Sequence, residues 1–299
     1  MTDSVPTVID LLTRTDFLVG GFLGMTGLVV LFFAPRTEDL SILDWGLILT
    51  AGAFLAVGLA LGASLALVVG LGALALGGWM ARPPSGSARA PFGWALIVIG
   101  ALAMVWRGGF PEIGWILALA PVAIVAIGTT LAAWATRLPQ QTLGIMIAIT
   151  AFGIWVTVPE TEGARALLGA SIPMALATLR PVGAKLGHAG AFALAGLIVW
   201  VVAIGGEARG ASIIGGWGCV GALAILPHYK PPPTRLVGSR RTITVLLHGL
   251  LVLVSSRIIG LWESGGPALV AVMVLGVGVY FALRLLPLVK PGRASLTKD

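Results

Sequence analysis

Arg257 lies inside an apolar run of the chain, five residues before the end of that run at Trp262. A charged side chain at membrane depth is costly, so it marks a binding site or an ion pathway. A carboxylate partner would come from another segment, and Glu160 and Glu162 are the predicted partners. The alternative is that Arg257 only extends its charge to nearby headgroups, because five residues span about 7.5 Å of helix.

A second group of charges follows an apolar run and consists of Glu160, Glu162 and Arg165. Together with Arg257, these residues predict an outer mouth that binds a cation or a lipid headgroup. The alternative is a capped helix start. Thr157 and Glu160 have capping-box spacing, and a surface ion pair between Glu162 and Arg165 would contribute about 0–1 kcal/mol.

A basic loop between residues 227 and 241 is the third candidate. Its positive charges could bind anionic lipid headgroups or an acidic protein partner. The alternative is that they only orient the chain in a membrane. The residues concerned are Lys230, Arg235, Arg240 and Arg241.

Residue types that hold metals are scarce and scattered. Cys219 is the single cysteine, and the three histidines are far apart in the sequence. His248 in an apolar run would need a carboxylate at similar depth to relay protons, and no apolar run supplies one, so a packing role is favoured. Phosphate-binding, zinc-protease and serine-hydrolase motifs are also missing from the sequence. We therefore predict no metal, no cofactor and no catalytic residue.

The elements that position these residues are long apolar runs. Hydrophobic residues make up 58% of the 299 residues, charged residues only 10%, and the mean hydropathy is +1.01. A soluble domain carries about 25% charged residues, so the composition predicts an all-α bundle of transmembrane helices without a soluble domain. The eleven predicted spans are 17–34, 45–61, 64–81, 91–106, 113–134, 141–158, 164–179, 187–205, 210–226, 243–262 and 267–288.

A ten-span arrangement is the alternative, because residues 45–81 could cross once instead of twice. Proline and basic residues stand together at alternate ends of the runs, as at Arg82-Pro83 and Arg180-Pro181. The positive-inside rule then puts the C-terminus in the cytoplasm of a bacterial plasma membrane. The net charge of +7 has the same origin, so nucleic acid is not expected as a partner.

The whole chain, 1–299, is predicted to be one membrane domain. Residues 1–16 would form an interfacial segment, residues 227–241 a basic cytoplasmic loop, and residues 289–299 a basic tail. Within the spans, Gly20 and Gly24 have the GxxxG spacing of closely packed helices. Pro121 and Pro173 would kink or break two spans.

The run Thr157-Val-Pro-Glu-Thr-Glu162 resembles a V-P-[D/E]-T-E feature of actinobacterial multi-span integral membrane proteins. The resemblance covers about ten residues and implies no activity. The length of the chain also resembles that of ten-span drug/metabolite transporters, as an analogy of size alone.

The favoured function is a non-catalytic integral membrane subunit or scaffold in bacterial cell-envelope assembly, with the lipid bilayer and a membrane protein as partners. Gly-tight packing without a cavity is the expectation for this role. The first alternative is a carrier or flippase for a small or lipid-linked substrate, with a wet cavity behind Arg257. The second is a lipid-dependent membrane glycosyltransferase that uses Glu38 and Asp39. An enzyme is the less favoured class.

Overall fold

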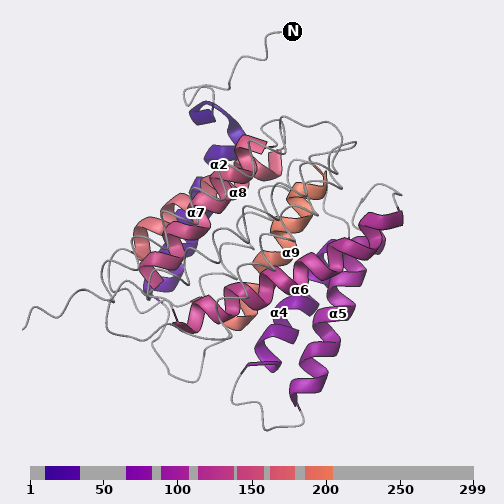
Figure 1. Ribbon diagram of the computed structural model, residues 1–299. Coiled ribbons are helices and arrows are strands. Elements are labelled where there is room, and N and C mark those ends of the chain that lie inside the picture. The colour runs from indigo at the N-terminus through magenta and orange to yellow at the C-terminus, as the bar shows by residue number, and fades with distance from the viewer. Residues whose placement is uncertain are drawn as a thin grey trace, which may run out of the picture.

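The computed structural model describes residues 11–33, 65–82, 89–107, 114–137, 140–157, 162–178 and 186–204. The regular structure of this part is entirely helical, as the sequence predicts (Figure 1). The helices are α2 (Thr15–Phe33), α4 (Leu65–Met80), α5 (Arg89–Arg107), α6 (Gly114–Arg137), α7 (Gln140–Thr157), α8 (Glu162–Thr178) and α9 (His188–Ile204).

The apolar runs predicted from the sequence coincide with these helices. Each described helix begins and ends within three residues of its run, as α2 does for 17–34 and α9 does for 187–205. Apolar composition and the charges and prolines that interrupt it are therefore sufficient to place helix ends. The predicted runs 45–61, 210–226, 243–262 and 267–288 lie outside the described residues.

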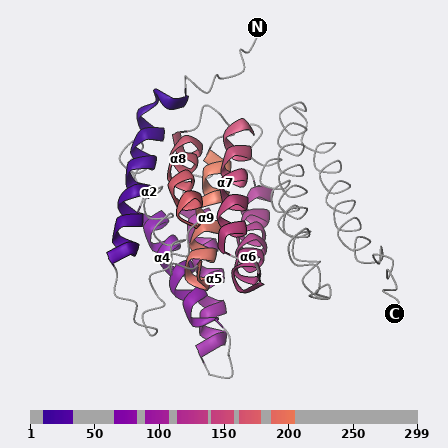
Figure 2. The same ribbon diagram turned by 90° about the vertical axis from the view of Figure 1, so that its left-hand side faces the viewer.

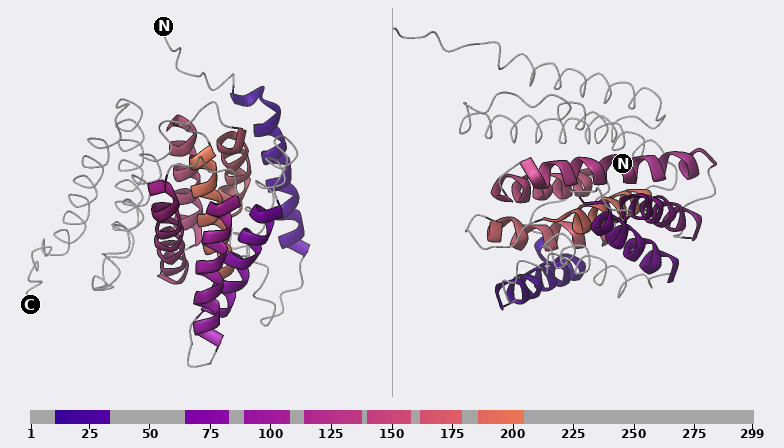
Figure 3. Two further views of the ribbon diagram at one scale, coloured as in Figure 1. Left: turned by 90° about the vertical axis from the view of Figure 1, so that its right-hand side faces the viewer. Right: turned by 90° about the horizontal axis from the view of Figure 1, so that it is seen from below.

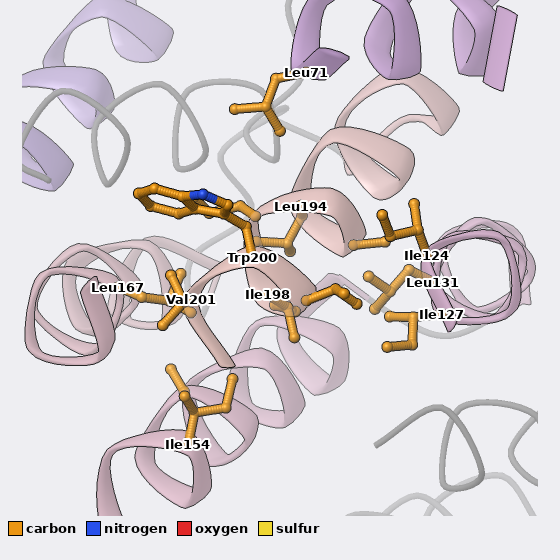
Figure 4. Packing of buried hydrophobic residues seen from close by; sticks show 14 of the residues in the cluster. Leu71, Ile124, Ile127, Leu131, Ile154, Leu167, Leu194, Ile198, Trp200 and Val201 are labelled. Atoms are coloured by element: carbon orange, nitrogen blue, oxygen red, sulfur yellow. The ribbon is translucent and has the colours of Figure 1, made fainter. Parts of the chain in front are cut away.

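Helix α9 lies in the middle of the described helices (Figures 2 and 3). It packs on α4 and α6, and α4 packs along the length of α5. On the other side, α8 joins α2 and α7 into a second group. The two groups meet where α8 contacts α9, and Leu167 of α8 and Val201 of α9 both belong to the buried core (Figure 4).

Phe192 of α9 is the largest fully buried side chain of the described core. Its ring meets Trp94 of α5 edge to face, with the ring centroids 5.9 Å apart and the planes at 87°. A Cβ atom on Gly128 of α6 would overlap this ring, and a Cβ atom on Gly78 of α4 would lie 2.9 Å from it. Glycines on two neighbouring helices thus provide the space that one aromatic ring occupies.

Helices α4 and α5 approach each other backbone to backbone. A Cβ atom on Gly77 would lie 2.7 Å from the carbonyl oxygen of Gly93, and one on Gly100 would lie 2.9 Å from that of Gly70. Residue numbers rise along α4 as they fall along α5 at these contacts, so the helices are antiparallel. Small residues that let two helix backbones approach are one general way to pack helices closely.

The prediction of an eleven-span or ten-span membrane bundle is wrong for the part of the chain that the structure describes. None of its helices is both long enough and apolar enough to cross a bilayer. Helices α4, α8 and α9 have 16, 17 and 17 residues. These lengths correspond to about 24–26 Å, short of the roughly 30 Å of a hydrocarbon core.

The predicted multi-pass location in a bacterial plasma membrane, with a cytoplasmic C-terminus, is contradicted by the same finding. The physical reason is that a helix that is apolar on all sides is suited to a protein core as well as to lipid. In α9 the described side chains from Ala189 to Val201 are buried by neighbouring helices. Apolar composition therefore shows that a segment is buried, without showing what buries it.

Pro121 and Pro173 lie inside α6 and α8, and both helices continue past them. Of the predicted kink or break, a break is therefore not formed at either position. A proline has no N–H, so Pro173 leaves the carbonyl group of Gly169, four residues earlier, without its usual helical donor. This carbonyl lies in the contact between α8 and α2.

Candidate functional site at the junction of α2 and α8

An ion pair joins the beginning of α2 to the beginning of α8. The Nε–H of Arg165 donates to Oδ2 of Asp16, 149 residues earlier in the chain. Only 11% of the Arg165 side chain and 10% of the Asp16 side chain are exposed. The Asp16 carboxylate depends on this pair, because removal of the Arg165 charge would leave it in a poorly solvated place.

Asp16 also contributes to the start of α2. It stands in the first turn of that helix, where a negative charge interacts favourably with the helix dipole. Its Oδ1 atom accepts a hydrogen bond from the backbone N–H of Phe17 at 3.0 Å. The two carboxylate oxygens thus have different partners, one within α2 and one on α8.

Beyond the ion pair, α2 and α8 meet through a small-residue seam, which consists of Gly20, Gly24, Ala166, Gly169 and Ala170. A Cβ atom on Gly20 would overlap the carbonyl oxygen of Ala166, and one on Gly24 would lie 2.8 Å from that of Ala170. Residue numbers rise together along both helices, so α2 and α8 are parallel. Gly20 and Gly24, predicted as a close-packing pair, lie in this seam.

The carbonyl oxygen of Gly169 is part of the same seam. It lies 3.7 Å from the position that a Cβ atom of Gly21 would occupy. Pro173 deprives this carbonyl of its helical donor, and the glycine backbone of α2 approaches it from the facing helix.

The opposite side of α2 carries large apolar side chains. We call Leu18, Phe22, Met25 and Val29 the outer face of α2; their exposed fractions are 54%, 71%, 54% and 53%. Their spacing follows the turns of one helix, so they form one stripe. Thr26, also exposed, donates its hydroxyl to the carbonyl of Phe22 at 2.9 Å, which satisfies that hydroxyl within the helix.

The structure places the predicted outer-mouth residues as follows. Arg165 is part of the ion pair with Asp16, and Glu162 is the first residue of α8. Glu160 and Arg257 lie outside the described residues, so the proposed contact between them stays a prediction. The basic-loop residues Lys230, Arg235, Arg240 and Arg241 also lie outside the described residues.

Asp16 is the residue of this candidate site that the sequence analysis does not single out. The predicted first span began at residue 17, so Asp16 was assigned to the preceding interfacial segment. Its signal in the sequence is an acidic residue in the first turn before an apolar run, which is typical of a helix start. Its pairing with Arg165 has no local signal, because the two residues are far apart along the chain.

A second polar cluster lies where α4 ends and α9 begins. The guanidinium carbon of Arg82 is 5.8 Å from the centre of the Trp79 ring, which is a cation–π distance. Burial, and next the positive charge of Arg82, lower the pKa of His188 below its ordinary value. The His188 ring is therefore neutral at physiological pH. The backbone carbonyl oxygen of His188 lies 2.5 Å from the position that a Cβ atom on Gly78 would occupy.

Within the described ranges, no three His, Cys, Asp or Glu side chains gather closely enough to hold a metal ion. No protein-family model matches the chain, and the comparison with curated proteins finds no similar protein. The resemblance at residues 157–162 therefore stays a prediction, and the function has to be inferred from the chain itself.

Proposed function

We propose that the chain is a non-catalytic helical subunit or scaffold, and that the outer face of α2 binds an apolar helix of another protein. The observation that carries this proposal is the distribution of side-chain size around α2. Glycines face α8, whereas Leu18, Phe22 and Met25 face away from it. A helix that only completed a core would direct its large apolar side chains inward.

The outer face of α2 suits a helical partner in its dimensions. Its four side chains extend over eleven residues, about 16 Å of helix, and an apolar stripe of this kind is how one helix recognises another. Figures 2 and 3 show α2 at the edge of the described helices. Contiguous exposed apolar patches are a recognised mark of interaction surfaces.

The charges next to the stripe indicate the chemistry of the partner. Arg14 is exposed just before α2 begins, whereas the neighbouring Asp16 is engaged by Arg165. Among the described residues, the charge displayed at this end of the stripe is therefore positive. The proposed partner is an apolar helix with a carboxylate side chain at the end that meets Arg14.

The test is site-specific photocrosslinking of the full chain in its native cells. A benzophenone amino acid replaces Phe22, and the matched control carries it at Phe92, an aromatic residue of α5 that is 67% exposed. We expect one discrete adduct from position 22, mapped by mass spectrometry to an apolar helix of another protein. The same adduct should be weakened several-fold by Arg14→Glu.

Three results would contradict the proposal: crosslinks from position 22 to lipid alone, equal adducts from positions 22 and 92, or an adduct that Arg14→Glu does not change. The carrier and glycosyltransferase alternatives stay predictions, because Arg257, Glu38 and Asp39 lie outside the described residues.

A further inference from the structure

Basic and aromatic side chains gather where α4 ends and α5 begins. A Cβ atom on Gly93 of α5 would lie 2.6 Å from the backbone nitrogen of Ala81, so the two helix ends are in contact. Side chains within about one turn of these two residues therefore share one end of the α4–α5 pair. We call this surface the basic–aromatic end; its members are Trp79, Arg82, Arg89, Phe92 and Trp94.

The basic–aromatic end is open to solvent although it carries large rings. Phe92 and Trp94 are 67% and 43% exposed. Arg82 and Arg89 are exposed as well. The guanidinium group of Arg82 lies over the face of the Trp79 ring, with its carbon 5.8 Å from the ring centre. Aromatic and arginine side chains held at a surface in this way are typical of an interface.

Among the described residues, the charge of this surface is positive. No Asp or Glu occurs between Asp44 and Glu112 in the sequence, whereas arginine occurs at positions 82, 89 and 107. Within the described ranges the acidic residues are Asp16 and Glu162, which lie in the first turns of α2 and α8 in the other group of helices. A surface with this charge attracts an anionic partner.

The directions of the two exposed rings distinguish between a helical protein partner and a lipid partner. Phe92 and Trp94 stand two residues apart on α5, so their side chains leave the helix about 200° apart. A single partner helix lies along one side of α5 and would leave one ring in water. A lipid headgroup layer is fluid and surrounds a helix end, so it accommodates both rings and brings lipid phosphates beside the arginines.

We propose that the basic–aromatic end binds an anionic lipid surface at the level of the headgroups. In this contact the rings of Phe92 and Trp94 lie among the headgroups, and Arg82 and Arg89 pair with phosphate oxygens. The contact requires no helix that crosses the bilayer. It involves α4 and α5, so it does not rest on the proposed binding of a partner helix to α2.

The test measures binding of the purified full chain to lipid vesicles by flotation. One set of vesicles contains phosphatidylcholine and phosphatidylglycerol, and the other contains phosphatidylcholine alone. The test variant is Arg89→Gln with Phe92→Ala, two substitutions at exposed positions of α5. The matched control is Arg14→Gln with Phe22→Ala, which removes the same residue types from exposed positions at α2.

We expect the parent to bind the anionic vesicles more strongly than the neutral ones, by about tenfold or more. One arginine near an anionic surface contributes a factor of about five, and burial of the Phe92 ring adds to it. The test variant should therefore bind the anionic vesicles about tenfold more weakly than the parent does. The control variant should bind them as the parent does, and added salt should weaken the binding of both.

A fluorophore that is sensitive to polarity gives a local readout. It is attached to Ala95→Cys on the exposed part of α5, in a Cys219→Ala background that removes the only native cysteine. Its emission should shift to shorter wavelength when anionic vesicles are added. The same fluorophore on Thr26→Cys, an exposed position of α2, should not respond.

Equal binding of the parent to the two kinds of vesicle would overturn the proposal. An equal loss of binding in the test and control variants would do the same, and so would unchanged binding of a test variant with the helix content of the parent. The experiment contains no partner protein, so its failure is distinguishable from a failure of the crosslinking at Phe22.

Discussion

At the scale of single residues, the close packing of this chain depends on glycines, which have only a hydrogen atom where other residues have a side chain. Gly20, Gly78 and Gly169 each lie where a Cβ atom would meet a backbone oxygen of another helix or segment. A backbone oxygen cannot rotate away as a side chain can, so each contact tolerates no larger residue. Gly72 is different, because nothing lies within 4 Å of its Cβ position.

This contrast predicts opposite effects of the same substitution. Gly20→Ala should lower the free energy of unfolding by roughly 1–3 kcal/mol, because α2 must move away from Ala166. Gly72→Ala, in the exposed part of α4, should raise it by about 0.5–1 kcal/mol through the lower entropy of the unfolded chain. Chemical unfolding followed by circular dichroism measures both. Equal effects of the two substitutions would show that α2 does not approach α8 closely.

His188 predicts a dependence of stability on pH. Burial and the charge of Arg82 lower its pKa in the folded chain, so the unfolded chain binds the proton more readily. The contribution of a neutral His188 is complete above its unfolded pKa of about 6.5 and is lost as the pH falls through the lowered folded pKa. Acid should therefore destabilise the protein.

The measurement compares unfolding of the parent and of His188→Gln between about pH 8 and about pH 5. We expect the variant to lose less stability than the parent over this range. Arg82→Gln, which removes the second cause of the shift, should lie between them. Parallel profiles for all three proteins would mean that His188 does not titrate in a buried place.

At the scale of elements, α9 determines how the first group of helices is assembled. Its Phe192 contacts α5 through Trp94 and occupies the space that Gly78 and Gly128 leave on α4 and α6. One side chain thus joins four helices, and a cavity at this position would be bordered by all of them. Gly78 and Gly128 have no side chains that could move into such a cavity.

Phe192→Ala should therefore lower the free energy of unfolding by about 3–5 kcal/mol. The matched control is Phe92→Ala, since Phe92 of α5 is 67% exposed, and its effect should stay within about 0.5 kcal/mol. Both are measured by denaturant unfolding of the purified chain. A loss below about 1 kcal/mol for Phe192→Ala would contradict the central position of α9.

At the scale of the whole molecule, the ends of the described helices could be predicted from the sequence. Which helices pack against each other could not. The ends of α5 and α7 could be predicted because charged or proline-containing segments interrupt the apolar runs. The pairing of α2 with α8 could not, because glycine occurs 42 times and the close-packing spacing is therefore common. The long-range pair of Asp16 and Arg165 has no counterpart in local spacing.

For the described helices, the membrane-spanning prediction was wrong for a related reason. Mean hydropathy counts apolar residues without regard to what covers them, and the buried side chains of α9 are covered by other helices. The exposed side chains of the molecule are more informative about function. Phe22 and its neighbours on α2 stay exposed although they are large and apolar, and the proposed binding surface depends on this exposure.

The most direct test compares two phenylalanines of the same helix. Phe17 of α2 is 9% exposed and packs in the core, whereas Phe22 is 71% exposed. In the purified chain, Phe17→Ala should cost about 3–5 kcal/mol of unfolding free energy and Phe22→Ala less than about 0.5 kcal/mol. If Phe22→Ala destabilised the isolated chain as much as Phe17→Ala, the outer face of α2 would be covered by the chain itself and could not be the surface that binds a partner.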